Sequence, residues 1–115
     1  MGDGIAEIAG ITRGLTAVTG SGGKTTLIRT LCEELRSRGT VILTTSTHIY
    51  PFAEYPLIHN GSDSVSRYLG SAGVVCVGTP AAEGKLTAPG ISFEMLVRLA
   101  DYVLVEADGS KGLPL

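Results

Sequence analysis

The sequence lacks the features that mark several common classes of protein. Its longest apolar runs, such as residues 102–105, are far shorter than the roughly 20 residues that a membrane-spanning helix needs. The first ten residues contain two acidic side chains and no basic one, so they do not resemble a secretory signal. We therefore expect no membrane span and, by default, a cytoplasmic location.

An excess of one charge and a metal-binding cysteine cluster are also missing. Nine basic and eleven acidic residues give a net charge of −2, without a basic stripe or a cluster of RNA-binding aromatic residues. This pattern argues against a nucleic-acid-binding module. Cys32 and Cys76 have no neighbouring cysteine or histidine at the spacing of a metal site. We expect both to be buried, reduced thiols.

Glycine, in contrast, is abundant at 16 of 115 residues, and its placement is informative. It clusters at residues 20–23, 70–73 and 109–112, where apolar runs end. Turns at such points are typical of α/β proteins. With 43% apolar residues, the chain is expected to form one domain over residues 1–115.

Strand and helix patterns alternate along the chain. Continuous Val/Ile/Leu/Thr runs predict buried strands at residues 15–19, 41–45, 73–78 and 102–106. Helical spacing of apolar residues predicts helices at residues 24–38, 62–69 and 92–100, the last capped by Ser92, and a short helix at residues 5–11. A loop is predicted at residues 51–60, and residues 84–87 are expected to pair back on the strand at residues 73–78 as an irregular hairpin. This order predicts an α/β fold with three layers and a mostly parallel sheet, like that of P-loop nucleoside triphosphatases.

Little sequence follows the last predicted strand. A parallel sheet needs cover on both faces, and residues 107–115 supply little of it. We therefore expect the chain to be the N-terminal part of a longer protein, with a domain that is incomplete at its C-terminus.

A glycine-rich loop joins the first predicted strand to the first long helix. It reads Thr19-Gly20-Ser21-Gly22-Gly23-Lys24-Thr25-Thr26. Glycines let backbone N–H groups curl around phosphate oxygens, and the helix N-terminus adds a partial positive charge. We predict that Lys24 neutralises the β- and γ-phosphates and that the Thr25 hydroxyl binds Mg²⁺. The alternative is a structural glycine turn, because the first glycine of the longer phosphate-loop pattern falls on Val18.

A carboxylate for the metal is expected at the carboxyl end of a neighbouring strand. Glu106 ends the last predicted strand, and Asp108 follows two residues later. We predict that Glu106 holds Mg²⁺, directly or through water. Asp108 is a candidate to orient water, to hold substrate or to bind the metal. The alternative is that both acids only solubilise the mouth of a loop.

Hydroxyl side chains also follow the second predicted strand, in the stretch Thr44-Thr45-Ser46-Thr47-His48. At this edge they are candidates to contact a Mg²⁺-bound water, the γ-phosphate or a second substrate. We predict such a role for Thr47 and His48. For Thr44 we favour a structural role as a strand-forming residue. His59 is expected to be a solvated loop residue.

With these segments in place, the chain resembles the selenium-dependent hydroxylase accessory proteins, the YqeC family. The resemblance rests on residues 19–26, residues 44–51, Gly84-Lys85-Leu86 and residues 105–115. The last stretch is the most specific, because Glu-Ala-Asp-Gly-Ser followed by a basic residue and Leu-Pro-Leu is no general nucleotide motif. The resemblance implies a nucleotide-dependent step in maturing or supplying molybdenum hydroxylases, and a full length about twice that of this chain.

Three functions agree with these residues. The first is Mg²⁺-dependent binding and hydrolysis, or phosphoryl transfer, of ATP or another nucleoside triphosphate, with Asp108, His48 and Lys111 as candidate catalytic residues. The second is a nucleotide-gated binding module with little turnover. The third is the ATP domain of an amide ligase, because the same segments also look like those of Mur-type ligases and folylpolyglutamate synthases. We adopt the first, with a molybdenum hydroxylase or its cofactor as the expected partner. The base, the second substrate and the oligomeric state are left open.

Overall fold

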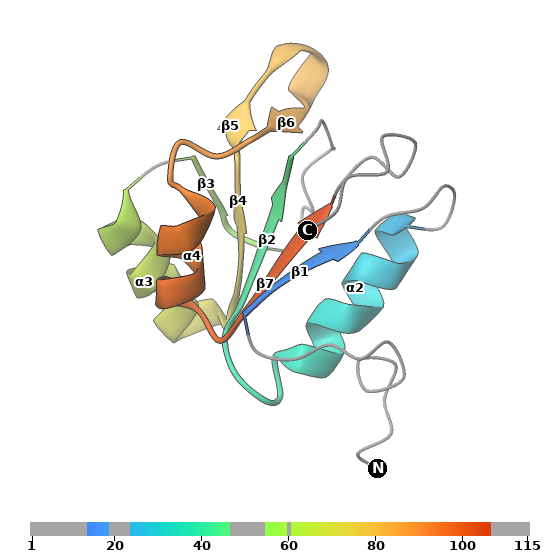
Figure 1. Ribbon diagram of the computed structural model, residues 1–115, viewed down its shortest axis with the longest axis vertical. Helices are drawn as coiled ribbons and strands as arrows, with labels where there is room; N and C mark the ends of the chain where they lie inside the picture. The colour runs from blue at the N-terminus through green and yellow to red at the C-terminus, as the bar shows by residue number, and fades with distance from the viewer. Residues whose placement is uncertain (1–13, 19–23, 47–54, 60, 107–115) are drawn as a thin grey trace.

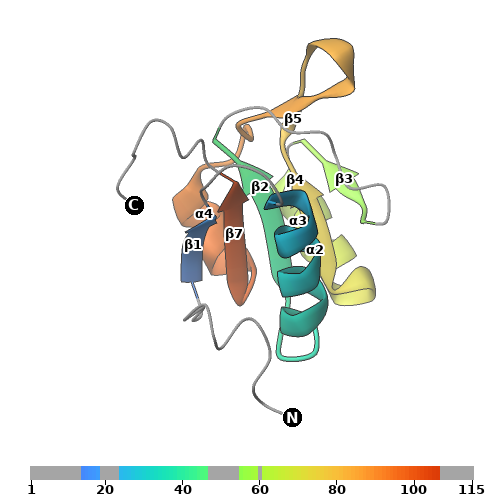
Figure 2. The same ribbon diagram turned by 90° about the vertical axis from the view of Figure 1, so that its right-hand side faces the viewer.

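The structure is a computed structural model that describes residues 14–18, 24–46, 55–59 and 61–106. A five-stranded sheet lies between helix α2 on one face and helices α3 and α4 on the other (Figures 1 and 2). The strands are β1 (Gly14–Val18), β2 (Val41–Thr45), β3 (Leu57–Ile58), β4 (Val74–Val77) and β7 (Tyr102–Glu106). The helices are α2 (Lys24–Leu35), α3 (Ser62–Ala72) and α4 (Phe93–Leu99).

The strand order of the sheet is β1-β7-β2-β4-β3, and each pair of neighbours runs parallel. The predicted α/β class with a mostly parallel sheet is therefore confirmed. Because neighbouring strands run in one direction, the carboxyl ends of β1, β7 and β2 lie side by side at one edge (Figure 1). This is the edge at which ligands of open α/β sheets usually bind.

Helix α2 forms because its apolar residues recur at helical spacing. Ile28, Leu31, Cys32 and Leu35 are at most 4% exposed and belong to the core between the helix and the sheet. The helix ends at Leu35 rather than at residue 38, because the N–H of Arg38 donates to the Leu35 carbonyl at 2.8 Å. A bond of this shorter span tightens the last turn of a helix.

Helices α3 and α4 cover the other face of the sheet. Ser92 caps α4 as predicted, since its hydroxyl accepts a hydrogen bond from the Met95 N–H at 3.2 Å. Leu96 of α4 is fully buried in the core on this face. Helix α3 continues past its predicted end to Ala72, where Gly73 stops it with a left-handed φ of 84°.

The predicted loop at residues 51–60 is wrong in part, because it contains strand β3. This strand exists through its pairing with β4, in which the Cys76 N–H donates to the Pro56 carbonyl at 2.8 Å and the Gly78 N–H to the Ile58 carbonyl at 3.1 Å. Two residues are too few to carry a periodic pattern, so only the partner strand reveals this element.

A small hairpin stands beyond the carboxyl end of β4 (Figure 1). Its strands β5 (Thr79–Pro80) and β6 (Leu86–Thr87) pair antiparallel, with the turn η1 (Ala82–Gly84) between them. The predicted hairpin strand at residues 84–87 is therefore right in part, because only Leu86–Thr87 forms a strand and its partner is β5 rather than the strand at residues 73–78. Leu86 anchors it in the core at 2% exposure, and Gly78 allows this approach, because a Cβ at Gly78 would lie 3.2 Å from the Leu86 Cβ.

Two hydrogen bonds join the residues that precede β2 and β7 at their amino ends. The Thr40 N–H donates to Asp101 Oδ2, and the Asp101 N–H donates to Thr40 Oγ1, each at 3.0 Å. These reciprocal bonds support the register in which Thr45 and Glu106 are paired at the other end of the same two strands.

The expectation for the two cysteines is met. Cys32 and Cys76 are buried thiols that form no disulfide. None of the helices in the described part of the chain has the length and apolar character to cross a membrane. The predicted helix at residues 5–11 lies outside the described residues.

Candidate functional site

The candidate site lies at the carboxyl edge, where β7 ends between β1 and β2. Glu106, the last residue of β7, pairs in register with Val18 at the end of β1 and with Thr45 at the end of β2. Thr45 and Glu106 are separated by 61 residues in the sequence, yet they are direct neighbours in the sheet. The carboxyl ends of β1, β7 and β2 therefore meet at this edge, as expected for neighbouring strands of a parallel sheet.

The side chains of Thr45 and Glu106 lie on the face of the sheet that α2 covers. Leu43 and Leu104 belong to the core under α2. Strand side chains alternate between faces, so residues two positions further along each strand lie on the same face. The Glu106 side chain therefore lies on the same face of the sheet as α2, the helix that follows the glycine-rich loop.

The Glu106 carboxylate is buried and hydrogen-bonded. The residue is only 7% exposed, and the Thr45 hydroxyl lies 2.9 Å from Glu106 Oε1 and 3.2 Å from the Glu106 carbonyl oxygen. The Ser46 N–H donates to the same carbonyl at 3.0 Å. A hydroxyl has one proton to donate, and the shorter contact is with the carboxylate. A charge-assisted bond of this kind is stronger than one to a neutral acceptor, so it orients the carboxylate.

Thr44, one residue earlier, lies on the opposite face of the sheet. It is 2% exposed, and its hydroxyl has no hydrogen-bond partner among the described residues. Its neighbours in register include Val105 of β7, which belongs to the core under α3 and α4. This environment supports the predicted structural role of Thr44 and separates it from the carboxylate.

The strand–loop–helix context predicted for the phosphate loop is present. β1 ends at Val18 and α2 begins at Lys24, and both of these ends lie at the carboxyl edge of the sheet (Figure 1). Thr26 is exposed in the first turn of α2. The other predicted site residues, or their side chains, lie outside the described residues. These are Gly20, Ser21, Gly22, Gly23, the side chains of Lys24 and Thr25, Thr47, His48, Asp108 and Lys111.

The Glu106 carboxylate at this edge is an oxygen ligand of the kind that Mg²⁺ prefers. Within the described residues, no group of three or more His, Cys, Asp or Glu side chains gathers that could form a metal cage on its own. Mg²⁺ prefers oxygen ligands and is usually held by one or two carboxylates together with substrate phosphates. A single oriented carboxylate beside a predicted phosphate loop matches that requirement. Glu106 and the predicted ligand Thr25 are the residues that would hold the ion.

Thr45 lies at this edge, and no individual role was predicted for it from the sequence. The signal that identifies it is strand alternation combined with register. Leu43 and Leu104 occupy one face, so Thr45 and Glu106 continue it, whereas Thr44 falls on the other. The relative register of β2 and β7 is needed for this step, and only the structure provides it.

These features define a class of protein. It has a parallel α/β sheet with helices on both faces, a helix that begins directly after a glycine-rich loop, and a buried glutamate at the carboxyl edge. The family described as YqeC protein matches residues 16–115. The chain therefore belongs to the YqeC family, and the resemblance found from the sequence motifs is confirmed.

A curated relative supports the same assignment. The "Uncharacterized protein YqeC" of Escherichia coli (strain K12) is 32% identical over an aligned length of 109 residues, and the match covers 86% of this chain and 42% of the relative. The chain thus spans less than half the length of that relative. No solved structure matches the chain.

Proposed function

We propose that this protein binds ATP, or another nucleoside triphosphate, together with Mg²⁺ at the carboxyl edge of β1, β7 and β2. The predicted phosphate ligands are the backbone of residues 20–23, Lys24 and the first turn of α2. The predicted metal ligands are Thr25 and Glu106. Bound Mg²⁺ would supply positive charge against the phosphates.

The observation that carries the proposal is the location of Glu106. Glu106 is only 7% exposed and ends β7 between β1 and β2, at the edge where ligands of open α/β sheets usually bind. Its carboxylate accepts a hydrogen bond from Thr45 and lies on the face covered by α2. A strand-end carboxylate beside a strand–loop–helix unit is the arrangement that nucleotide-binding α/β proteins use for a metal.

The reaction that we propose is hydrolysis of the nucleotide or transfer of its terminal phosphoryl group, in the maturation of selenium-dependent molybdenum hydroxylases. This role rests on the resemblance to the accessory-protein family. Asp108, His48 and Lys111 are the candidates that activate the attacking group.

Thermal unfolding of the full-length protein with ATP, with and without Mg²⁺, tests the binding proposal. A ligand at 100 times its Kd stabilises a protein by about 2.7 kcal/mol, which is easily measured. Lys24→Ala should weaken ATP binding both with and without Mg²⁺. Glu106→Gln should leave metal-free binding nearly intact and reduce the gain from Mg²⁺. Equal losses in both variants would mean that Glu106 supports the loop and does not bind a metal.

Turnover is tested separately, by phosphate release. Asp108→Asn should spare the affinity for ATP with Mg²⁺ and lower kcat by roughly 100-fold, the usual scale for a general acid or base. A wild-type protein that binds ATP without any turnover, even with a candidate molybdenum hydroxylase present, would favour the nucleotide-gated binding module.

A further inference from the structure

The buried pair of Thr45 and Glu106 carries an inference that rests on the proposed function and extends it. The Thr45 hydroxyl donates to Glu106 Oε1 at 2.9 Å across the β2–β7 register, and both residues are buried, at 0% and 7% exposure. A carboxylate oxygen accepts more than one bond, so this contact is compatible with a cation on the same group.

We propose that Thr45 is a positioning residue, which holds the carboxylate of Glu106 in the direction that Mg²⁺ binding requires. A glutamate side chain has three rotatable bonds, and fixing it costs conformational entropy. The β-branched Thr45 has few rotamers of its own, and its backbone is held in the sheet. Its hydroxyl therefore fixes the direction of the carboxylate before any ligand arrives. Groups that orient a metal ligand in this way typically change metal affinity by about 10–100-fold when they are removed.

The chain offers a matched control next to this residue. Thr44 and Thr45 are consecutive, both lie in β2, and both are buried. Their hydroxyls differ in environment, because that of Thr45 bonds to Glu106 while that of Thr44 has no partner among the residues described. Valine has nearly the shape of threonine, so the same substitution at the two sites separates the hydroxyl from the packing.

The experiment measures the Kd of ATP for the full-length protein in EDTA and in saturating Mg²⁺, and takes the ratio as the Mg²⁺-dependent gain. Thr45→Val should reduce the Mg²⁺-dependent gain by roughly tenfold, or abolish the gain if it is less than about tenfold in the wild type. The Kd measured in EDTA should change little. Thr45→Ser keeps the hydroxyl and should retain the gain, and so should Thr44→Val. In a Glu106→Gln background, Thr45→Val should have no further effect, because Thr45 acts through Glu106.

Each other result overturns the inference in a recognisable way. An unchanged gain in Thr45→Val, with a normal gain in the wild type, removes the role of Thr45 and leaves the proposed function intact. A loss that persists in the Glu106→Gln background means that Thr45 contacts the ligand itself. No Mg²⁺-dependent gain in the wild type removes the proposed function and this inference together. Should Thr45→Val fail to fold, Thr45→Cys provides the test, because it keeps a side chain of similar size with a much weaker donor.

Discussion

At the scale of single residues, the two consecutive threonines of β2 contribute to stability in opposite ways. The Thr45 hydroxyl is satisfied by Glu106, so its burial is compensated. The Thr44 hydroxyl is buried without a partner among the described residues, and burying such a group costs free energy. The threonine hydroxyl therefore contributes to stability at position 45 and lowers stability at position 44.

This difference predicts that Thr44→Val raises the free energy of unfolding by about 1 kcal/mol, because it removes an unpaired hydroxyl without changing the packed volume. Thr45→Val should lower it by about 1–3 kcal/mol, because it leaves a buried carboxylate with one bond fewer. Urea unfolding of the two variants measures both changes. A destabilised Thr44→Val would show that the hydroxyl has a partner outside the described residues.

At the scale of secondary-structure elements, the register between β2 and β7 depends on close contacts at their amino ends. Gly39 precedes the reciprocal bonds of Thr40 and Asp101, and a Cβ at Gly39 would overlap the Asp101 carboxylate. Glycine is therefore needed at position 39, because there is no room for a Cβ beside Asp101. A side chain there has to displace the carboxylate that receives the Thr40 N–H.

We predict that Gly39→Ala lowers the free energy of unfolding by about 1–3 kcal/mol, the usual cost of overpacking. Gly70→Ala is the matched control, because Gly70 is exposed in α3 and a Cβ there meets nothing within 4 Å. This change should raise stability by about 0.5–1 kcal/mol, since glycine is a poor helix former. Thermal or urea unfolding distinguishes the two, and equal effects would mean that Asp101 moves aside without cost.

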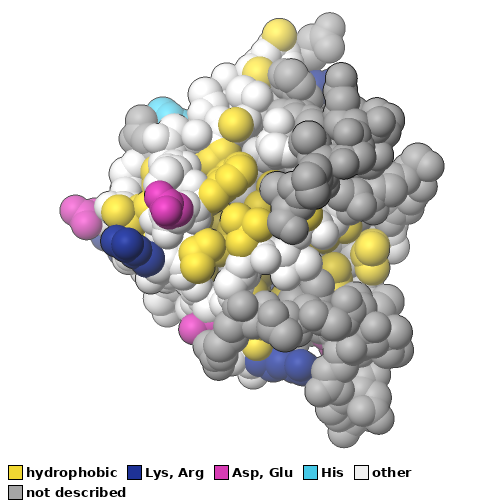
Figure 3. All heavy atoms as spheres, viewed as in Figure 1, with side chains coloured by type: hydrophobic (Ala, Val, Ile, Leu, Met, Phe, Trp, Pro, Cys, Tyr) yellow, Lys and Arg dark blue, Asp and Glu magenta, His cyan; other side chains and the backbone are white. Residues whose placement is uncertain are grey.

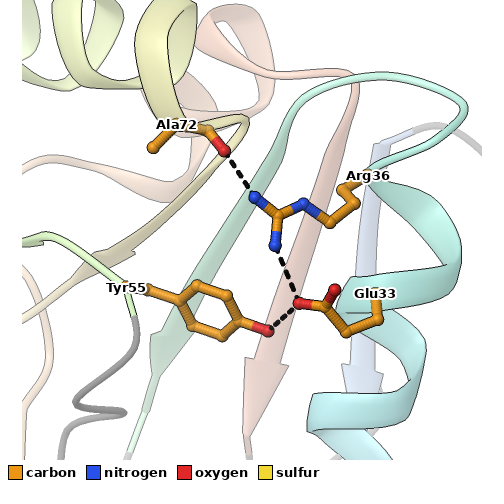
Figure 4. A network of polar contacts seen from close by, with 4 residues as sticks. All are labelled: Glu33, Arg36, Tyr55 and Ala72. Carbon is orange, nitrogen blue, oxygen red and sulfur yellow. Dashed lines mark hydrogen bonds and ion pairs between the residues drawn. The ribbon is translucent and has the colours of Figure 1, made fainter.

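A second contact between elements ties α2 to the chain before β3 (Figure 4). The Tyr55 hydroxyl donates to Glu33 Oε2 at 2.7 Å, and Arg36 donates to the same oxygen at 2.9 Å. Arg36 also donates to the Ala72 carbonyl at 2.8 Å, which joins the end of α3 to the group. Tyr55 is buried at 6% exposure, so its hydroxyl is largely shielded from water where it bonds to Glu33.

We predict that Tyr55→Phe costs about 1 kcal/mol of stability, since it deletes one hydrogen bond to a partly solvated carboxylate. Tyr68→Phe is the control, because Tyr68 is 45% exposed and water replaces any bond of its hydroxyl. Its effect should stay within about 0.5 kcal/mol. Similar losses in both variants, measured by urea unfolding, would contradict a specific role for the Tyr55 contact.

The elements were largely predictable from the sequence where burial is continuous. The bounds of β2 and β7 agree with the prediction, because apolar runs in a parallel sheet are buried on both faces. β3 was not predictable, since its two residues form a strand only through β4. Thr45, the hydrogen-bond partner of Glu106, could not be predicted from the sequence for a related reason. Thr44 and Thr45 look alike in the sequence, and only the register set near Thr40 and Asp101 decides which of them meets the carboxylate.

At the scale of the whole molecule, the edge strand β1 is less well covered than the inner strands β2 and β7. All residues of β2 and β7 are buried, whereas four of the five residues of β1 are only half-buried. β1 is an edge strand, paired with β7 alone within the described residues. Figure 3 shows apolar side chains gathered beside α4, on the flank toward β7 and β1. Met95 and Val97 of α4 are 38% and 36% exposed.

This asymmetry predicts the order of amide hydrogen exchange in the chain of 115 residues. Amides of β2 and β7 should exchange slowest, because they lie between two strands and under helices on both faces, whereas amides of β1 should exchange faster, since an edge strand opens without breaking a second ladder. ATP with Mg²⁺ should then slow exchange most at the ends of β1 and β7 and in the first turn of α2, where the proposed ligand binds. Mass spectrometry of peptic fragments measures all three effects. Protection of β1 equal to that of β7 before any ligand is added would mean that another strand, or a second copy of the chain, covers this edge in solution, and a protein concentration series would separate those two cases.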